Sequence, residues 1–302
     1  MHRITNGLRA IVSAGVLLCV CAAAWGGHQP DHEGERLTPE QVGGEKRMGA
    51  MLTEARTLAQ RGAYDAAVRN YVHVFNYGRG IARLEIVRLA LVPQEIAALG
   101  EKFPPALLAL REEVRIRAGL ILNNVAGTDE ILELISLNHA LEQPRRSLEL
   151  YDQLKSMGER SRDTRLLMRA VLSQELLDAR RFDELGEQVV VLAQQWVQRV
   201  AMLEVESEFG VARDDYFQER RDTALNGAPQ IYEALLSTQR DDAANQFANR
   251  VLRFEHSVSI YTALVNAALR AQRTAVAQAL VARAGKELAP AELAGLRTLL
   301  PK

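Results

Sequence analysis

Cysteine is almost missing from this chain, which has only Cys19 and Cys21 among its 302 residues. Both lie in an apolar N-terminal segment, so a chain that has lost this segment contains no cysteine at all. Such a chain can hold no disulfide framework and no cysteine-containing zinc site. Its fold must then depend on a hydrophobic core, which a hydrophobic content of 48% can supply at this length.

An excess of charge of either sign is also missing. The sequence has 37 Lys and Arg against 38 Asp and Glu, which gives a formal net charge of −1. Domains that bind nucleic acids carry a clearly basic balance or a basic patch. The composition offers no such footprint, so we expect no nucleic acid among the partners.

The first residues have the three parts of a secretory signal peptide. Arg3 and Arg9 give a positive start, residues 10–21 are apolar, and three alanines follow. The apolar run is shorter than the roughly 20 residues that span a bilayer. We expect cleavage after Ala24 to remove residues 1–24, leaving an exported, periplasmic chain with no integral membrane domain. Retention of the segment as an anchor helix is the alternative.

The rest of the chain divides into a linker and a helical part. Residues 25–47 are polar and carry prolines and glycines, which predicts a flexible linker. In residues 48–302 prolines are few, and the alternation typical of strands is absent. Apolar residues in the stretch 48–61 instead recur at the spacing of an amphipathic helix. We therefore expect an all-α domain over residues 48–302. Within it, Asn226 and Gly227 predict the end of one helix, and Pro229 predicts the start of the next.

The stretch from Gly62 to Phe75 has the pattern of a junction between two packed helices. Gly62 and Tyr64 form the turn, Ala67 lies three residues after Tyr64, and Tyr71 lies four residues after Ala67. A small residue at Ala67 lets two helix backbones approach closely, and Tyr71 shares its face. These residues resemble the tetratricopeptide (TPR) helical hairpin. The resemblance implies a scaffold of stacked helix pairs that binds partners and performs no chemistry of its own.

Three later segments repeat the spacing around this turn. The corresponding pairs are Leu58 with Asp65, Leu176 with Asp183, Leu235 with Asp242 and, more weakly, Ala268 with Ala275. The last two copies are 33 residues apart, close to the ~34-residue TPR period, whereas the earlier spacings are 59 and 118. Phe182, Ala244 and Ala277 take the aromatic or small positions of these copies. We expect stacked antiparallel helix hairpins in a TPR-like α-solenoid that is irregular in the middle.

Sequence motifs for catalysis and for binding metals or cofactors are absent. The six histidines form no His-Glu-x-x-His pair, and no nucleophile elbow, phosphate-binding loop or dinucleotide fingerprint occurs. We expect no catalytic residue, metal or cofactor. One fragment, residues 206–209, resembles the Glu-Ser-x-Phe motif of lytic transglycosylases, exported enzymes that cleave peptidoglycan. That resemblance implies Glu206 as general acid and base, whereas the same residues also fit a charged helix face.

The leading expectation is a non-catalytic protein–protein interaction or scaffold protein of the bacterial envelope. Its partner would be a protein or peptide, and self-association is a further expectation. Trp196 and Tyr216 are candidate anchors for a partner, although their spacing also fits an apolar core stripe. The candidate polar residues of a peptide groove are Asn70, Asn249, Arg250 and Asn266.

Overall fold

The computed structural model describes residues 39–208 and 215–301, and within these ranges the chain forms helices and their connections only. The expected all-α class is therefore confirmed. Contacts divide the chain into two compact units, one ending at Leu172 and the other beginning at Ser173. In the described part of the chain, no helix has the length and apolarity needed to cross a membrane. The predicted signal peptide, residues 1–24, lies outside the described residues.

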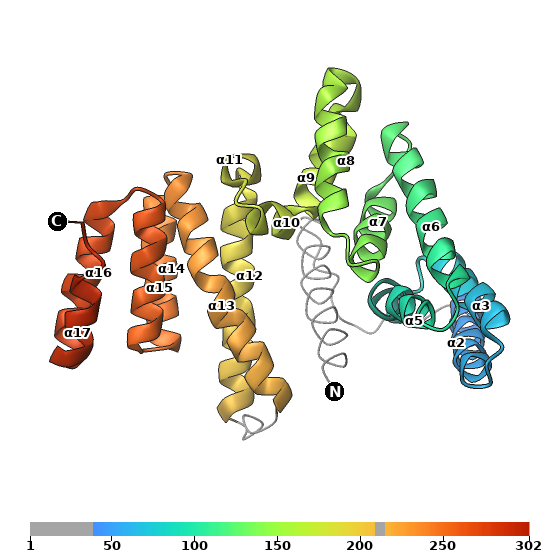
Figure 1. Cartoon of the computed structure of the whole chain (residues 1–302), viewed down its shortest axis with the longest axis horizontal. Helices are drawn as coiled ribbons and strands as arrows, with labels where there is room; N and C mark the ends of the chain where they lie inside the picture. Colours follow the sequence, from blue (N-terminus) through green and yellow to red (C-terminus); the bar gives the residue numbers. More distant parts are fainter. Residues whose placement is uncertain (1–38, 209–214, 302) are drawn as a thin grey trace. The chain divides into compact units, whose positions relative to one another are not determined.

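The described part of the first unit begins with a helical hairpin and continues through further helices (Figure 1). Its α-helices are α2 (Pro39–Gln60), α3 (Tyr64–Tyr77), α4 (Ala82–Ile86), α5 (Val92–Leu99), α6 (Pro105–Leu122), α7 (Thr128–Ala140), α8 (Arg145–Ser156) and α9 (Arg162–Val171). A π-helical segment, η1 (Val87–Leu91), joins α4 to α5, and a 3-10 segment, η2 (Gly158–Ser161), precedes α9. The helix α7 packs against α5, α6, α8, α9 and the π-helical segment, so it is the central helix of this unit.

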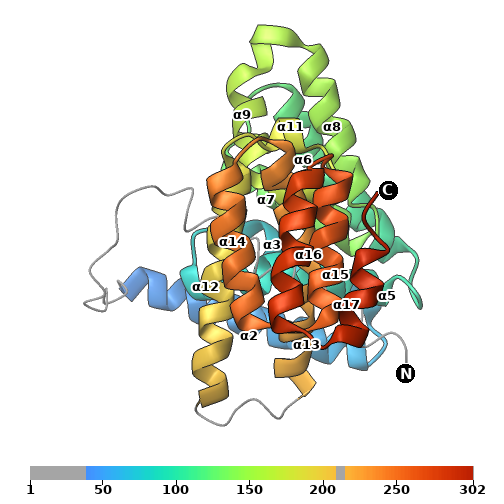
Figure 2. The ribbon, with the colours of Figure 1, turned by 90° about the vertical axis from the view of Figure 1, so that its left-hand side faces the viewer.

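The second unit is a succession of packed helices, several of which lie side by side in both views (Figures 1 and 2). These are α10 (Ser173–Asp178), α11 (Phe182–Leu185), α12 (Gln188–Glu208), α13 (Asp215–Ser237), α14 (Asp241–Phe254), α15 (Val258–Arg270), α16 (Thr274–Glu287) and α17 (Pro290–Arg297). The helix α13 packs against α12, α14 and α15, so it is the central helix of this unit.

One turn geometry ends the first helix of each hairpin. A residue with positive φ follows the helix, and the next residue donates its N–H to the carbonyl five residues earlier, which satisfies a helix-end acceptor. The left-handed residues are Gly62, Asn124, Glu142, Arg180, Gln239 and Gln272. The carbonyl acceptors are Leu58, Leu120, Asn138, Leu176, Leu235 and Ala268. Four of these acceptors are the residues that begin the aligned sequence segments, while the turns after Leu120 and Asn138 are not among the aligned copies.

The small and aromatic positions after these turns lie in the core. Ala67, Ala244 and Ala277 have exposed fractions of 0%, as close contact between helix backbones requires. Tyr71 and Phe182 are also buried, and the ring centroid of Tyr64 lies 6.1 Å from that of Phe103. Burial raises the pKa of the Tyr71 hydroxyl, and its hydrogen bond with Glu95 raises it further. Tyr71 thus connects the first hairpin to α5.

Two helix boundaries differ from those expected. The helix α2 begins at Pro39, so residues 39–47 of the expected linker are helical. The helix α13 continues through Asn226, Gly227 and Pro229, where a break was expected. Ala224, Ala228, Ile231 and Leu235 are buried along α13, and this continuous packing outweighs the local helix breakers.

A buried carboxylate, Glu133 on α7, binds three arginines in the first unit. Its oxygens lie 2.6 Å from Arg88 Nη1, 2.8 Å from Arg117 Nε and 2.7 Å from Arg79 Nη2. The side chains of Glu133 and Arg88 are only 0% and 1% exposed. Arg88 belongs to η1, and it also donates to the Phe75 carbonyl at 3.1 Å. The network therefore fixes the π-helical segment to both α3 and α7.

A second buried carboxylate, Glu233 on α13, binds two arginines in the second unit. Its side chain is 1% exposed, and it pairs with Arg180 and, at 2.8 Å, with Arg270 Nε. Arg180 is the left-handed residue of the turn between α10 and α11, and Arg270 is the last residue of α15. Glu233 thus links three elements that are distant in sequence.

Replacing a left-handed turn residue by glycine should stabilise the fold. Gln272 has φ +58° and is exposed, so Gln272→Gly relieves the steric penalty of that conformation. We expect the free energy of unfolding to rise by about 0.5–1 kcal/mol in urea denaturation. The matched change Gln246→Gly, at an exposed site inside α14, should lower it by a similar amount. A loss of stability in both variants would contradict the role of the turn.

The buried network predicts a large effect for Glu133→Gln. The change leaves the guanidinium groups of Arg88 and Arg117 buried without their shared counter-charge, and we expect the free energy of unfolding to fall by about 3 kcal/mol. Glu112→Gln is the control, because the Glu112–Arg115 pair is exposed and should contribute little. Urea denaturation measures both, and equal small effects would show that the buried pair is dispensable.

Candidate partner-binding groove

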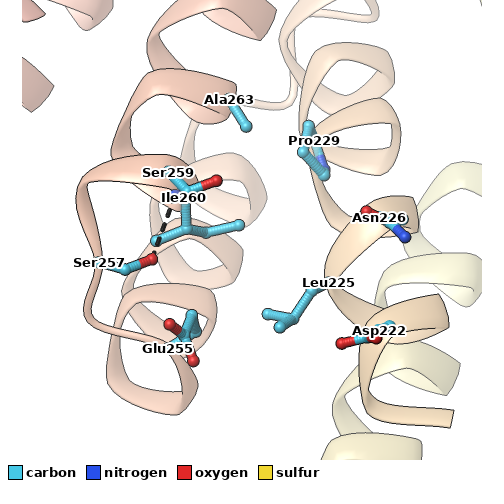
Figure 3. A pocket seen from close by; sticks show the side chains of 9 residues that line it. All are labelled: Asp222, Leu225, Asn226, Pro229, Glu255, Ser257, Ser259, Ile260 and Ala263. Atoms are coloured by element: carbon cyan, nitrogen blue, oxygen red, sulfur yellow. Dashed lines mark hydrogen bonds between the residues drawn. The ribbon is translucent and has the colours of Figure 1, made fainter. Parts of the chain in front are cut away.

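A groove of about 550 Å³ opens between α13 and the start of α15 in the second unit (Figure 3). One wall is a single face of α13, formed by Asp222, Leu225, Asn226 and Pro229. These residues follow the i, i+3, i+4, i+7 spacing of one helix face, so their side chains project to the same side. Asp222 and Asn226 are exposed, whereas Leu225 and Pro229 are half-buried.

The opposite wall comes from the connection between α14 and α15 and from the first turns of α15. It is formed by Glu255, Ser257, Ser259, Ile260 and Ala263. Ser257 is the N-cap of α15, and its hydroxyl accepts the Ile260 N–H at 3.4 Å. Ile260 is buried and gives this wall an apolar base (Figure 3).

Charges around the groove are partly paired. Glu255 forms an ion pair with Arg221, whose guanidinium carbon lies 5.8 Å from the centre of the Phe254 ring. Asp222 is the other carboxylate of the groove, and it is exposed. The backbone of α13 contributes a further polar group. Pro229 has no N–H, so it cannot donate to the Leu225 carbonyl as another residue at this position would. That carbonyl therefore lacks its ordinary helical donor.

The candidate anchor Trp196 lies in the core and not on the surface. Its side chain is 2% exposed, and its indole Nε1 donates to the Ala224 carbonyl at 2.7 Å. Its ring centroid lies 4.9 Å from that of Phe247, and Phe254 is also nearby at 6.2 Å. The interpretation of Trp196 as a partner anchor is therefore wrong, because packing against α13 and α14 buries the ring.

The other candidate residues are spread over both units and do not form one site. Tyr216 is 47% exposed, with the Arg220 guanidinium carbon 4.9 Å from its ring centre. Arg250 pairs with Glu204, and Asn249 accepts from Arg283. Asn266 is half-exposed on α15, while Asn70 is half-exposed on α3 of the other unit. None of these residues lines the groove.

Glu206 lies near the end of α12 and forms an ion pair with Arg220. A general acid needs a carboxyl group that is open to its substrate, whereas Arg220 occupies the carboxylate of Glu206. The pair therefore fits the interpretation of a charged helix face. Among the described residues, no group of His, Cys, Asp and Glu side chains is arranged to hold a metal ion.

The groove could be found from sequence only in part. The face of α13 that lines it is visible as a helical spacing from Asp222 to Pro229, and Ser257 before an apolar run is a helix-cap signal. The expected break at Asn226 and Gly227 hid this face, because it assigned Asp222 and Pro229 to different helices. The pairing of α13 with α15 is a tertiary contact that spacing does not reveal.

A cluster around Glu287, beyond the groove, predicts a pH dependence of stability. Hydrogen bonds from Tyr261 and His256, together with Arg283, lower the pKa of Glu287 to about 2, while burial raises the pKa of Tyr261 to about 12. The His256 Nε2 to Glu287 Oε2 distance is 2.9 Å, and the Arg283 Nε to Oε1 distance is 3.0 Å. The folded state therefore favours the ionised carboxylate of Glu287.

A depressed pKa stabilises the fold above the unfolded value of about 4.3 and loses this effect as the pH falls toward 2. Glu287→Gln should lower the melting temperature at pH 7, with a free-energy change of roughly 1 kcal/mol or less because the carboxylate is partly exposed. The difference from the unmodified chain should shrink between pH 5 and pH 3. Glu208→Gln, at an exposed carboxylate, is the control. A difference that stays constant with pH would refute the assignment.

Comparisons of the chain with protein families, with curated proteins and with solved structures find no match. The TPR-like resemblance of the Gly62–Phe75 hairpin therefore remains a proposal.

Proposed function

We propose that this chain is an exported, non-catalytic protein-binding component of the bacterial envelope. The observation that carries the proposal is the groove between α13 and α15, which is large enough for side chains of a bound peptide. Its walls belong to long, well-packed helices, so a partner would meet a preformed surface. The bound class is a protein or peptide.

The proposed location rests on the N-terminal sequence. A positive start, a short apolar run and a row of alanines support export and cleavage after Ala24. A mature chain without cysteine suits an oxidising compartment, since it has no thiols that could mispair.

Recurring hairpin turns support a repeat-type scaffold. The same left-handed residue and the same long backbone hydrogen bond occur after Leu58, Leu176, Leu235 and Ala268. Each hairpin buries one side of its helices and needs a neighbour to cover the other, which is the principle of stacked helical repeats. A TPR-like α-solenoid is the arrangement we propose from these turns, and such scaffolds act by binding.

The lytic-transglycosylase alternative has less support. It depends on Glu206, whose carboxylate is held in an ion pair with Arg220. Self-association remains part of the binding proposal, since a second copy is also a protein partner.

Photo-crosslinking from defined positions tests the proposed function. A photoreactive phenylalanine derivative at Ser259, on the groove, should give a discrete crosslinked product in cells that make the chain. The same derivative at Gln278, which is exposed on α16, should give none. Mass spectrometry then identifies the product as another protein or as a second copy.

Two results would contradict the proposal. One is a periplasmic fraction in which neither position gives a product. The other is a purified mature chain that digests peptidoglycan and loses this activity in Glu206→Gln, which would establish the enzyme.

A further inference from the structure

We propose that the groove between α13 and α15 binds the cationic side chain, lysine or arginine, of an extended segment of the partner protein. This inference rests on the proposed function and specifies its ligand. Three features of the groove carry it: an apolar base, a wall of hydrogen-bond acceptors, and a charge balance that favours a cation.

The apolar base fits an aliphatic stem. Ile260 is 5% exposed, and Leu225, Pro229 and Ala263 are half-buried around it. Lysine and arginine carry three or four methylene groups that lie readily along apolar surface while the charged head reaches polar groups. The volume of about 550 Å³ exceeds that of one side chain, so it leaves room for the neighbouring backbone of the ligand.

The α13 wall supplies acceptors for the head group. Asp222 contributes a carboxylate and Asn226 an amide oxygen, four residues apart on one helix face (Figure 3). Between them, the Leu225 carbonyl has lost its helical donor because residue 229 is proline. A carbonyl without its helical donor has a free acceptor, which an ammonium or guanidinium N–H can use.

The remaining charges leave a negative balance. In the described part of the chain, the cationic side chain that pairs with a groove residue is Arg221, and Glu255 neutralises it. The first turn of α15 presents the positive end of a helix on the opposite wall, where the Ser257 hydroxyl accepts one of the free N–H groups, that of Ile260. Asp222 has no such partner among the groove residues, so an anionic ligand would meet repulsion where a cationic one meets attraction.

These features also orient the ligand. The head group lies against Asp222 and the Leu225 carbonyl, and the stem crosses Ile260 toward Ala263. The hydroxyl of Ser259, exposed at the α15 side, is then available to the peptide backbone of the ligand.

Short peptides provide the test with the full mature chain. The probes are acetyl-Gly-Gly-Lys-Gly-Gly-amide, the same peptide with norleucine in place of lysine, and the same peptide with glutamate. We expect the lysine peptide to bind at least tenfold more tightly than the norleucine peptide and the glutamate peptide not to bind, as measured by shifts of backbone amide signals in NMR titrations.

Two variants separate ligand binding from stability. Asp222→Asn should weaken binding of the lysine peptide about fivefold or more, whereas Asp242→Asn, an exposed acid on α14 outside the groove, should leave it unchanged. Pro229→Ala gives residue 229 an N–H that can donate to the Leu225 carbonyl. This variant should melt at a higher temperature and yet bind the lysine peptide several-fold more weakly.

Equal affinities for the lysine and norleucine peptides would overturn the proposal, as would unchanged binding in Asp222→Asn. A lysine peptide that shifts no groove signals at millimolar concentration would overturn it as well. If the crosslink from Ser259 persists alongside any of these results, the protein-binding function stands and only the cationic ligand is wrong. If the crosslink is also absent, both fail.

Discussion

The left-handed residue that ends the first helix of each hairpin is the constraint on which the arrangement of helices depends. A positive φ at Gly62, Arg180, Gln239 or Gln272 lets the next N–H reach the carbonyl five residues back, which closes the helix and reverses the chain. The second helix then begins close to the first. A wholly buried alanine a few residues later, as at Ala244 and Ala277, allows the two backbones to remain in contact. Glycine is absent from most of these turns, so tertiary packing must offset a local steric cost of about 1 kcal/mol at each.

Arginines at these turns extend the constraint from one hairpin to its neighbours. Arg180 pairs from the turn itself with the buried Glu233 of α13. The residues after the next two left-handed positions are Arg240 and Arg273. Arg240 pairs with Glu187, just before α12, and Arg273 pairs with Asp241, the first residue of α14. The exposed pairs contribute little energy, whereas the buried carboxylates at Glu133 and Glu233 require their partners, because an unpaired charge in the core is strongly destabilising. The buried pairs therefore act mainly by destabilising other helix arrangements, in which Glu133 or Glu233 would be buried without a cationic partner.

Local features of the fold could be predicted from sequence, and non-local ones could not. The all-α class follows from composition and helical spacing, and alignment on Leu58, Leu176, Leu235 and Ala268 located four turns of the same geometry. The alignment missed the turn after Asn138 because Asn138 and Arg145 occupy the places where the first three copies have Leu and, seven residues later, Asp. The Glu133 network joins residues more than 40 positions apart, such as Arg88, and no spacing rule connects them. The spacing of Trp196 fits a surface anchor and a core residue equally well, and only its packing against α13 shows that it lies in the core.

The helix α13 passes through residues that ordinarily interrupt a helix, and these residues lie beside the groove. Asn226, Gly227 and Pro229 disfavour a helix, and an interior proline alone costs about 3 kcal/mol. Packing of Ala224, Ala228 and Ile231 holds the helix together in spite of this cost. Two successive carbonyls of α13 then have different surroundings. That of Ala224 receives the indole N–H of Trp196 from the core side. That of Leu225 lacks its helical donor on the face that lines the groove. The proline therefore does not end the helix but leaves an acceptor on the surface where we propose that a partner binds.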